Sequence, residues 1–155
     1  MRSSLKLLAL GATLTLGVAC STAALAADKE QVIKDRQALM KDQGRQWLVV
    51  RNYTQGKADQ AAATSALASL IKSLPTVPDY FPPGTEGPNP DGKWGPKPEV
   101  WSERDKFLAA DKTVADQVAA LDAAVKSGDQ PKVAAAFKDL DACSGCHKTF
   151  RAKLQ

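Results

Sequence analysis

The sequence predicts an all-α protein, an antiparallel four-helix bundle with a long Pro/Gly-rich loop between its second and third helices. Three observations support this prediction. Apolar residues recur at helical intervals in four segments, and no segment shows the alternation typical of a strand. The links between the four segments are short, long and short in turn, which suits a bundle with one crossover connection.

The first 26 residues have the pattern of a secretory signal peptide. Arg2 and Lys6 precede an apolar run over residues 7–19, and residues 24–26 are the small-x-small sequence that signal peptidase accepts. We therefore expect cleavage after residue 26, a periplasmic protein, and one mature domain over residues 27–155. The stretch before Cys20 loosely resembles a lipobox, but its spacing is off by one residue, so a lipid anchor at Cys20 is disfavoured.

The first two helices of the mature chain are expected over residues 28–53 and 57–74. Asp28, with Gln31 three residues later, resembles a capping box at the start of the first helix, and Gly56 separates the two helices. The second helix is rich in alanine, which has high helix propensity and allows neighbouring helices to approach closely. The residues expected to face inward are Val32, Ile33, Leu39, Met40, Trp47 and Val50 in the first helix, and Ala63, Leu67, Leu70, Ile71 and Leu74 in the second.

Residues 75–98 form the long connection. Eight of the nine prolines and four of the ten glycines lie in it, so no helix is expected there. A connection of this length inside a compact domain is usually functional or folded over an exposed core. Tyr80, Phe81 and Trp94 indicate that the segment packs onto the bundle and is not a free linker.

The third helix is expected over residues 99–127 and the fourth from about residue 129 to residue 154. Gly128 is a natural stop for the third helix, and Asp129 with Pro131 suits the start of the fourth. The residues expected to face inward are Trp101, Leu108, Val114, Val118, Leu121 and Val125 in the third helix, and Val133, Phe137, Leu140, His147 and Leu154 in the fourth.

Cys143, Cys146 and His147 form a C-x-x-C-H motif, the signature of covalent haem attachment in c-type cytochromes. If the last helix continues through the motif, the two cysteines lie three residues apart on one face, where they can reach the two vinyl groups of one haem. His147 shares that face and can coordinate the iron.

Three other interpretations of the motif are weaker. A structural disulfide would not need the adjoining histidine, and a thioredoxin-like redox pair belongs in a βαβ setting that this helical chain lacks. A structural zinc site needs four ligands, and residues 27–155 contain no other cysteine or histidine. The motif therefore predicts one covalently bound haem c, with its iron, as the cofactor.

A second axial ligand of the iron is expected from the first helix. Only residues 148–155 follow the motif, and none of them is a usual haem ligand. Met40 is the only methionine after residue 26, and no second histidine exists, so Met40 is the remaining candidate. The alternative is that Met40 simply fills a gap in the core, which is the commoner role of methionine in a bundle.

The charge of the chain argues against a nucleic-acid partner. The formal net charge of +4 includes Arg2 and Lys6, which leave with the signal peptide, so the mature chain carries only +2. Charges of both signs in nearly equal numbers are typical of an ordinary soluble surface.

The mature chain resembles the class II cytochromes c, the family of cytochrome c-prime and its low-spin relatives, over nearly its whole length. The stretches that carry the resemblance are VIKDRQALM at 32–40, FPPGTEG at 81–87, KPEVWSERDKF at 97–107 and CSGCHKTFR at 143–151. The resemblance implies that Cys143 and Cys146 form the thioethers and that His147 is an axial ligand. It also implies that Met40 takes the ligand position of the six-coordinate, low-spin members, where high-spin members often have leucine.

The same resemblance implies roles for three further residues. Arg36, with Gln37 beside it, would lie near a haem propionate, and Arg151 would flank the imidazole of His147. The alternative for Arg36 is an ordinary solvated charge on a helix. Because the family often forms homodimers through its first two helices, the resemblance also implies a homodimer.

These residues predict a one-electron carrier and not an enzyme. Its partners would be periplasmic or membrane-bound redox proteins in transient complexes, with no small-molecule substrate. The alternative is a five-coordinate protein, similar to cytochrome c-prime, that binds nitric oxide or carbon monoxide for storage, sensing or protection. A haem peroxidase is disfavoured, because the chain has no second histidine for distal acid–base chemistry.

Overall fold

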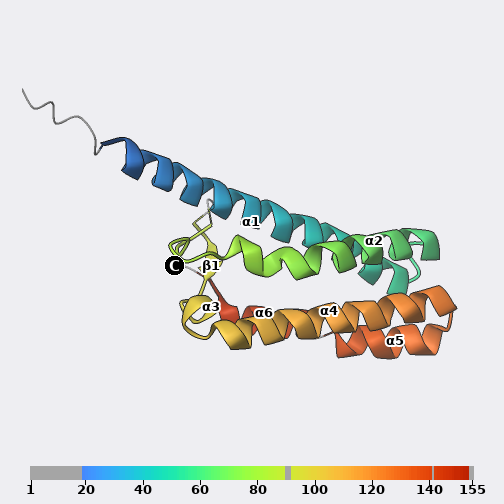
Figure 1. Cartoon of the computed structure of the whole chain (residues 1–155). Coiled ribbons are helices and arrows are strands. Elements are labelled where there is room, and N and C mark those ends of the chain that lie inside the picture. The colour runs from blue at the N-terminus through green and yellow to red at the C-terminus, as the bar shows by residue number, and fades with distance from the viewer. Residues whose placement is uncertain (1–18, 90–91, 141, 154–155) are drawn as a thin grey trace, which may run out of the picture.

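The computed structural model describes residues 19–89, 92–140 and 142–153 (Figure 1). Side chains are described from residue 28 onward, except those of residues 142–144. The elements in chain order are α1 (Ala19–Thr54), α2 (Gln60–Ser73), the 3-10 helix η1 (Leu74–Tyr80), β1 (Trp94–Pro96), α3 (Glu99–Ser102), α4 (Arg104–Ser127), α5 (Gln130–Asp139), α6 (Ala142–Phe150) and β2 (Arg151–Lys153).

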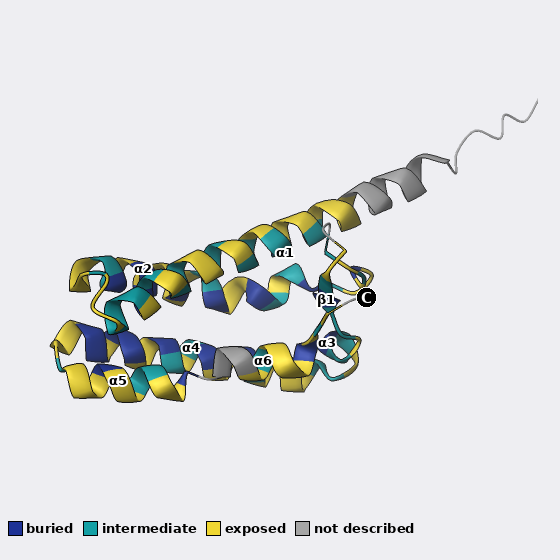
Figure 2. Ribbon diagram, turned by 180° about the vertical axis from the view of Figure 1, so that it is seen from behind, coloured by how far each residue is buried: buried dark blue, intermediate teal, exposed yellow. Residues whose placement is uncertain are grey.

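The helices form the predicted four-helix bundle. α1 packs against α2, α2 packs against α4, and α4 packs against both α5 and α6. Because α5 and α6 follow each other along the same side of α4, they together take the place of the fourth helix (Figures 1 and 2). The long connection runs from α2 to α3 at the end of the bundle where α6 also ends.

α1 begins at Ala19, well before the predicted start at Asp28, so the predicted capping box is wrong. The side chain of Gln31 instead donates a hydrogen bond to Asp35, one turn further along the helix, at 2.8 Å. The reason is the sequence AALAA at 23–27, whose high helix propensity continues the helix across the predicted cleavage point. Among the described residues, no helix is both long enough and apolar enough to cross a membrane.

α2 begins three residues later than predicted, because Asp59 caps it. The Asp59 carboxylate accepts a hydrogen bond from the backbone N–H of Ala62 at 2.7 Å. After Ser73 the chain continues as η1, so the expectation that residues 75–98 contain no helix was wrong for their first part. Pro75 is tolerated in the first turn of η1, where a backbone N–H has no partner within the helix.

The predicted third helix is two helices, α3 and α4, because Glu103 interrupts it with φ −118° and ψ 47°. The buried stripe of α4 includes Phe107 and Asp111, while Leu108 is 40% exposed and not buried as predicted. Gly128 ends α4 as predicted, with φ 71° in the left-handed region. The remaining inward-facing residues predicted for α4 are buried: Val114, Val118, Leu121 and Val125.

The predicted fourth helix is also divided. α5 ends at Asp139, and α6 begins at Ala142 and ends at Phe150. The predicted helical position of Leu154 lies outside the described residues. The chain after α6 forms β2, which pairs antiparallel with β1 of the long connection, with Gly95 opposite Ala152. No strand was predicted, because three residues are too few to show a polar–apolar alternation.

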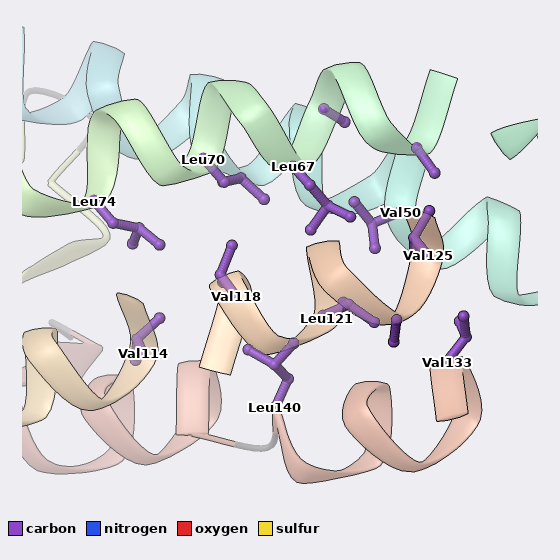
Figure 3. Packing of buried hydrophobic residues seen from close by; sticks show 13 residues of the cluster. Val50, Leu67, Leu70, Leu74, Val114, Val118, Leu121, Val125, Val133 and Leu140 are labelled. Atoms are coloured by element: carbon purple, nitrogen blue, oxygen red, sulfur yellow. The ribbon is translucent and has the colours of Figure 1, made fainter. Parts of the chain in front are cut away.

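The larger of two buried apolar clusters joins α1, α2, α4 and α5 (Figure 3). Trp47 of α1 and Phe137 of α5 stack beside it, with ring centroids 5.1 Å apart. The predicted inward-facing residues that belong to this cluster are Val50, Ala63, Leu67, Leu70, Leu74, Val114, Val118, Leu121, Val125, Val133 and Leu140. Ile71 was expected among them, but it is 38% exposed.

The smaller cluster lies where the long connection meets α4 and α6. Its buried members are Val77, Phe81, Val100, Phe107 and Phe150. Phe81 packs edge-on against Trp101 and against Phe107. The indole N–H of Trp101 donates hydrogen bonds to the carbonyls of Phe81 and Pro82, both at 3.1 Å. The predicted packing of the long connection onto the bundle is thus confirmed.

Candidate haem site

A cavity of about 420 Å³ lies between α1 and the segment formed by α6 and β2. This volume is within the range of pockets that hold small molecules and cofactors. Apolar residues from both buried clusters form much of its wall. The predicted site residues that line the cavity are Arg36, Gln37, Met40, Cys146, His147 and Arg151. The side chain of Cys143, the remaining predicted site residue, lies outside the described residues.

α1 lines the cavity with one face. Arg36, Met40 and Trp47 lie four and seven residues apart, which places them on the same side of a helix. Met40 is half-buried and packs against the smaller apolar cluster. The helical periodicity of α1 therefore directs both the thioether and the guanidinium of the predicted site into one space.

α6 forms the facing part of the wall. The backbone is helical from Ala142 to Phe150, so positions 143, 146 and 147 share one helix face, as the motif requires. Cys146 and His147 both line the cavity. Burial of the imidazole lowers the pKa of His147, and the nearby charge of Arg151 lowers it further. Both effects favour the neutral imidazole, which is the form that binds a metal.

Arg36 is not the solvated charge that one interpretation expected, because only 2% of its surface is exposed. Its guanidinium donates hydrogen bonds to the carbonyls of Tyr80 and Thr85 at 3.2–3.3 Å, and it lies 4.7 Å from the ring centroid of Phe81. Burial lowers the pKa of Arg36, while the nearby carboxylate of Glu86 acts in the opposite direction. Arg36 thus ties α1 to the long connection at the edge of the cavity.

One polar atom of Arg36 has no partner among the described residues. The Nε atom is buried without a hydrogen bond. A buried charged donor in this condition is costly, and an anionic group in the cavity would satisfy it. The residues present therefore fit a haem, whose propionates are anionic and whose porphyrin suits the apolar walls.

Arg151 does not lie on α6, as the prediction of one continuous helix required, but in β2. Its guanidinium stacks on the ring of Trp94 in β1, 4.0 Å from the centroid. The backbone N–H of Lys97 also bonds to the carbonyl of Phe150 at 2.9 Å. The β1–β2 pair therefore fastens the long connection to the end of α6, and it keeps Arg151 close enough to His147 to affect the imidazole pKa.

Asp111 of α4 is a cavity residue that the sequence did not reveal. It is 8% exposed, and burial raises its pKa to about 6. Its place four residues after Phe107 and three before Val114, within an apolar stripe, was the one available signal. Elsewhere, among the described residues, no three His, Cys, Asp or Glu side chains gather in a way that could hold a metal ion.

A helical bundle with C-x-x-C-H on its last helix and a cofactor-sized cavity beside it defines a c-type cytochrome. The family model described as "Cytochrome C'" matches residues 31–151, and the chain belongs to this family.

Three relatives give the extent of the similarity. Cytochrome c-556 of Rhodopseudomonas palustris is 34% identical, with 88% of this chain and 93% of the relative covered. Cytochrome c' of Alcaligenes xylosoxydans xylosoxydans is 32% identical, with 82% and 98% covered. The solved nitric oxide complex of a point mutant of cytochrome c prime from Alcaligenes xylosoxidans superposes with a TM-score of 0.70 at 28% identity, with 81% and 96% covered.

Membership of this family shows the cofactor, a covalently bound c-type haem with its iron. The relatives are haem proteins of the electron-carrying or gas-binding kind. The protein therefore belongs to a group with two functional types.

Proposed function

We propose that the protein is a periplasmic one-electron carrier with a six-coordinate, low-spin haem. Cys143 and Cys146 form the thioethers, and His147 and Met40 are the axial ligands of the iron. The observation that supports this proposal is that Met40 lines the same cavity as His147 but comes from α1, whereas His147 comes from α6. An iron in that cavity can be bound from two separate helices.

The haem supplies one-electron chemistry at its iron when bound. The protein supplies the ligands, the burial and the charge. A thioether ligand from Met40 favours the ferrous state and raises the reduction potential. Arg36, with its unpartnered Nε, offers a buried donor to a propionate, and Gln37 lines the cavity beside it. Arg151 keeps a positive charge near the imidazole of His147.

The location and the partners follow from the leader and the function. Removal of residues 1–26 would shorten α1 to a start near Asp28, whose carboxylate would then lie in the first turn and interact favourably with the helix dipole. An exported carrier would exchange electrons with periplasmic or membrane-bound redox proteins in short-lived complexes. A homodimer formed through α1 and α2 is part of this proposal.

Substitution of Met40 tests the proposal. Met40→Leu should convert the low-spin absorption spectrum of the reduced protein to a high-spin one, because leucine fills the same space but cannot coordinate iron. Leu39→Ile is the matched control, since Leu39 is the neighbouring half-buried residue of the same cluster. It should retain the low-spin spectrum. A low-spin spectrum in Met40→Leu would remove Met40 from the site.

The second candidate function is gas binding by a five-coordinate iron. The observation that favours it is the similarity to the cytochrome c prime of Alcaligenes xylosoxidans, which is recorded as a nitric oxide complex of a mutant. In that case, the reduced wild-type protein would be high-spin and would bind nitric oxide or carbon monoxide rapidly. Spectra of the reduced protein before and after exposure to each gas separate the two functions.

A further inference from the structure

Asp111 lies in the cavity wall without a partner. It belongs to α4, is 8% exposed, and faces the same cavity as Met40 and His147. Among the described residues its carboxylate has neither a hydrogen bond nor an ion pair. The residues one helical turn before and after it on the same face are Phe107 and Ala115, so its own helix supplies no cation.

Asp122, further along α4, is a buried aspartate that has an ion pair. It is also 8% exposed, and its Oδ2 accepts a hydrogen bond from the ammonium of Lys126 at 2.7 Å, four residues along the helix, while its Oδ1 is buried without a hydrogen bond. Asp122 does not line the cavity. The two residues share a type, a helix and a degree of burial, and they differ in pairing and in contact with the cavity.

The charges around Asp111 make it unusual within the site. The other charged or titratable groups that line the cavity are Arg36 and Lys41 from α1, Cys146 and His147 from α6, and Arg151 from β2. Among the described residues that line the cavity, Asp111 is therefore the one with an acidic side chain. Among the described side chains, the elements packed against α4 carry further titratable groups that do not line the cavity: Lys72 in α2, Asp79 and Tyr80 in η1, Glu99 in α3, Lys132, Lys138 and Asp139 in α5, and Lys148 in α6.

Resting on the proposed electron-carrier function, we propose that Asp111 is the proton acceptor that couples each electron to a proton. When a redox partner donates an electron, the positive charge in the cavity falls by one. The Asp111 carboxylate then takes a proton from solvent, and an O–H bond forms. When the electron leaves to an acceptor, that bond breaks and the proton returns to solvent, so charge and atoms balance in both directions.

The sign of the effect follows from the burial of the carboxyl. Burial alone raises the pKa of Asp111 to about 6. The more positive oxidised site favours the carboxylate and lowers this pKa, and reduction removes that influence. Between the two pKa values, reduction takes up a proton, so the reduction potential falls as the pH rises. The limiting slope is a tenfold change in the equilibrium constant per pH unit, about 59 mV for one electron.

The test is a redox titration of the haem-loaded protein between about pH 4 and pH 8, with Asp111→Asn, Asp111→Glu and Asp122→Asn as variants. The wild-type potential should fall with pH in part of this interval. Asp111→Asn should remove most of that fall, because the amide keeps the shape but cannot titrate. Asp111→Glu should restore a fall, and Asp122→Asn should match the wild type.

Proton uptake gives a second readout that a purely structural role would not change. Photochemical reduction in weak buffer with an indicator dye should show uptake of a fraction of a proton per electron in the wild type near pH 6, and a loss of it in Asp111→Asn. Equal slopes and equal uptake in these two proteins would overturn the proposal. A wild-type reduction potential that does not change with pH, with no proton uptake on reduction, would also overturn the proposal. This result is decisive even if Asp111→Asn fails to hold haem. A wrong assignment of Met40 can be distinguished from a wrong proposal for Asp111. It would change the spin state of the haem, whereas the comparison of wild type with Asp111→Asn would remain valid.

Discussion

At the scale of single residues, Arg36 has two tasks at the edge of the cavity. Its guanidinium binds the carbonyls of Tyr80 and Thr85, which holds the long connection against α1. Its Nε is buried without a hydrogen bond, and we propose that a group inside the cavity accepts one from it. A planar guanidinium can serve both directions at once because its donors are spread over a rigid fork, whereas a lysine ammonium is a single point charge.

Arg36→Lys should therefore lower the free energy of unfolding by about 2 kcal/mol, since it loses several charge-assisted hydrogen bonds but keeps the charge. Urea denaturation of the haem-loaded protein measures this change. Arg45→Lys is the control, because Arg45 is exposed and pairs with Asp42 on the surface at 2.8 Å. It should change stability by less than about 0.5 kcal/mol. A similar effect of the two substitutions would contradict the role given to Arg36.

The sequence was most informative about residues that have distinctive chemistry. The C-x-x-C-H spacing identified Cys146 and His147, and scarcity identified Met40, and all three line the cavity. Asp111 was missed, because the sequence spacing of an acidic residue is the same whether it lies inside a buried apolar stripe or at the exposed border of that stripe. Asp111 lies in register with the buried residues Val114 and Val118, but the pattern alone does not show whether a carboxylate in that position is buried.

At the scale of elements, the end of α4 provides a test of local backbone geometry. Gly128 has φ 71°, a conformation that costs an alanine about 1 kcal/mol. We expect Gly128→Ala to destabilise the protein by about this amount in thermal or urea denaturation, although a new Cβ would meet nothing within 4 Å. Gly128→Asn should cost less, because asparagine tolerates left-handed backbone. Equal costs would indicate that the turn has rearranged.

The elements themselves were predicted well, and their interruptions were not. A break of one or two residues does not visibly disturb an apolar spacing of about 3.6 residues. The interruptions at Glu103 and before Ala142 therefore could not be predicted from the apolar pattern. The β1–β2 pair depends on contacts between segments far apart in the chain, which no local pattern encodes. The early start of α1 reflects the high helix propensity of the alanines at residues 23–27, which continues the helix upstream of Asp28.

At the scale of the whole molecule, the two apolar clusters have different relations to the cofactor. The larger cluster packs helices directly against one another (Figure 3). The smaller cluster, with Met40 and Cys146 beside it, borders the cavity that we propose for the haem. Burial that depends on the cofactor is lost when the cofactor is absent, so the two regions should respond differently to its removal.

The haem-free protein, made by changing Cys143 and Cys146 to serine, should keep the larger cluster and loosen around the cavity. Hydrogen exchange should be faster by about tenfold or more, equal to about 1.4 kcal/mol of lost protection, in α6 and near Met40. Amides of α2 and of the second half of α4 should change less. Uniform acceleration along the chain would show that the two clusters form a single cooperative unit.

The stacked pair of Trp47 and Phe137 has an optical consequence. Trp47 packs against the larger cluster and lines the cavity, and Trp94, under the guanidinium of Arg151, lines the cavity as well. A haem in that cavity would quench the fluorescence of both tryptophans by energy transfer. The folded, haem-loaded protein would therefore fluoresce weakly, and unfolding or loss of the haem would increase the fluorescence. The aromatic side chains that complete the packing thus also make the protein an intrinsic fluorescent reporter of its own cofactor loading.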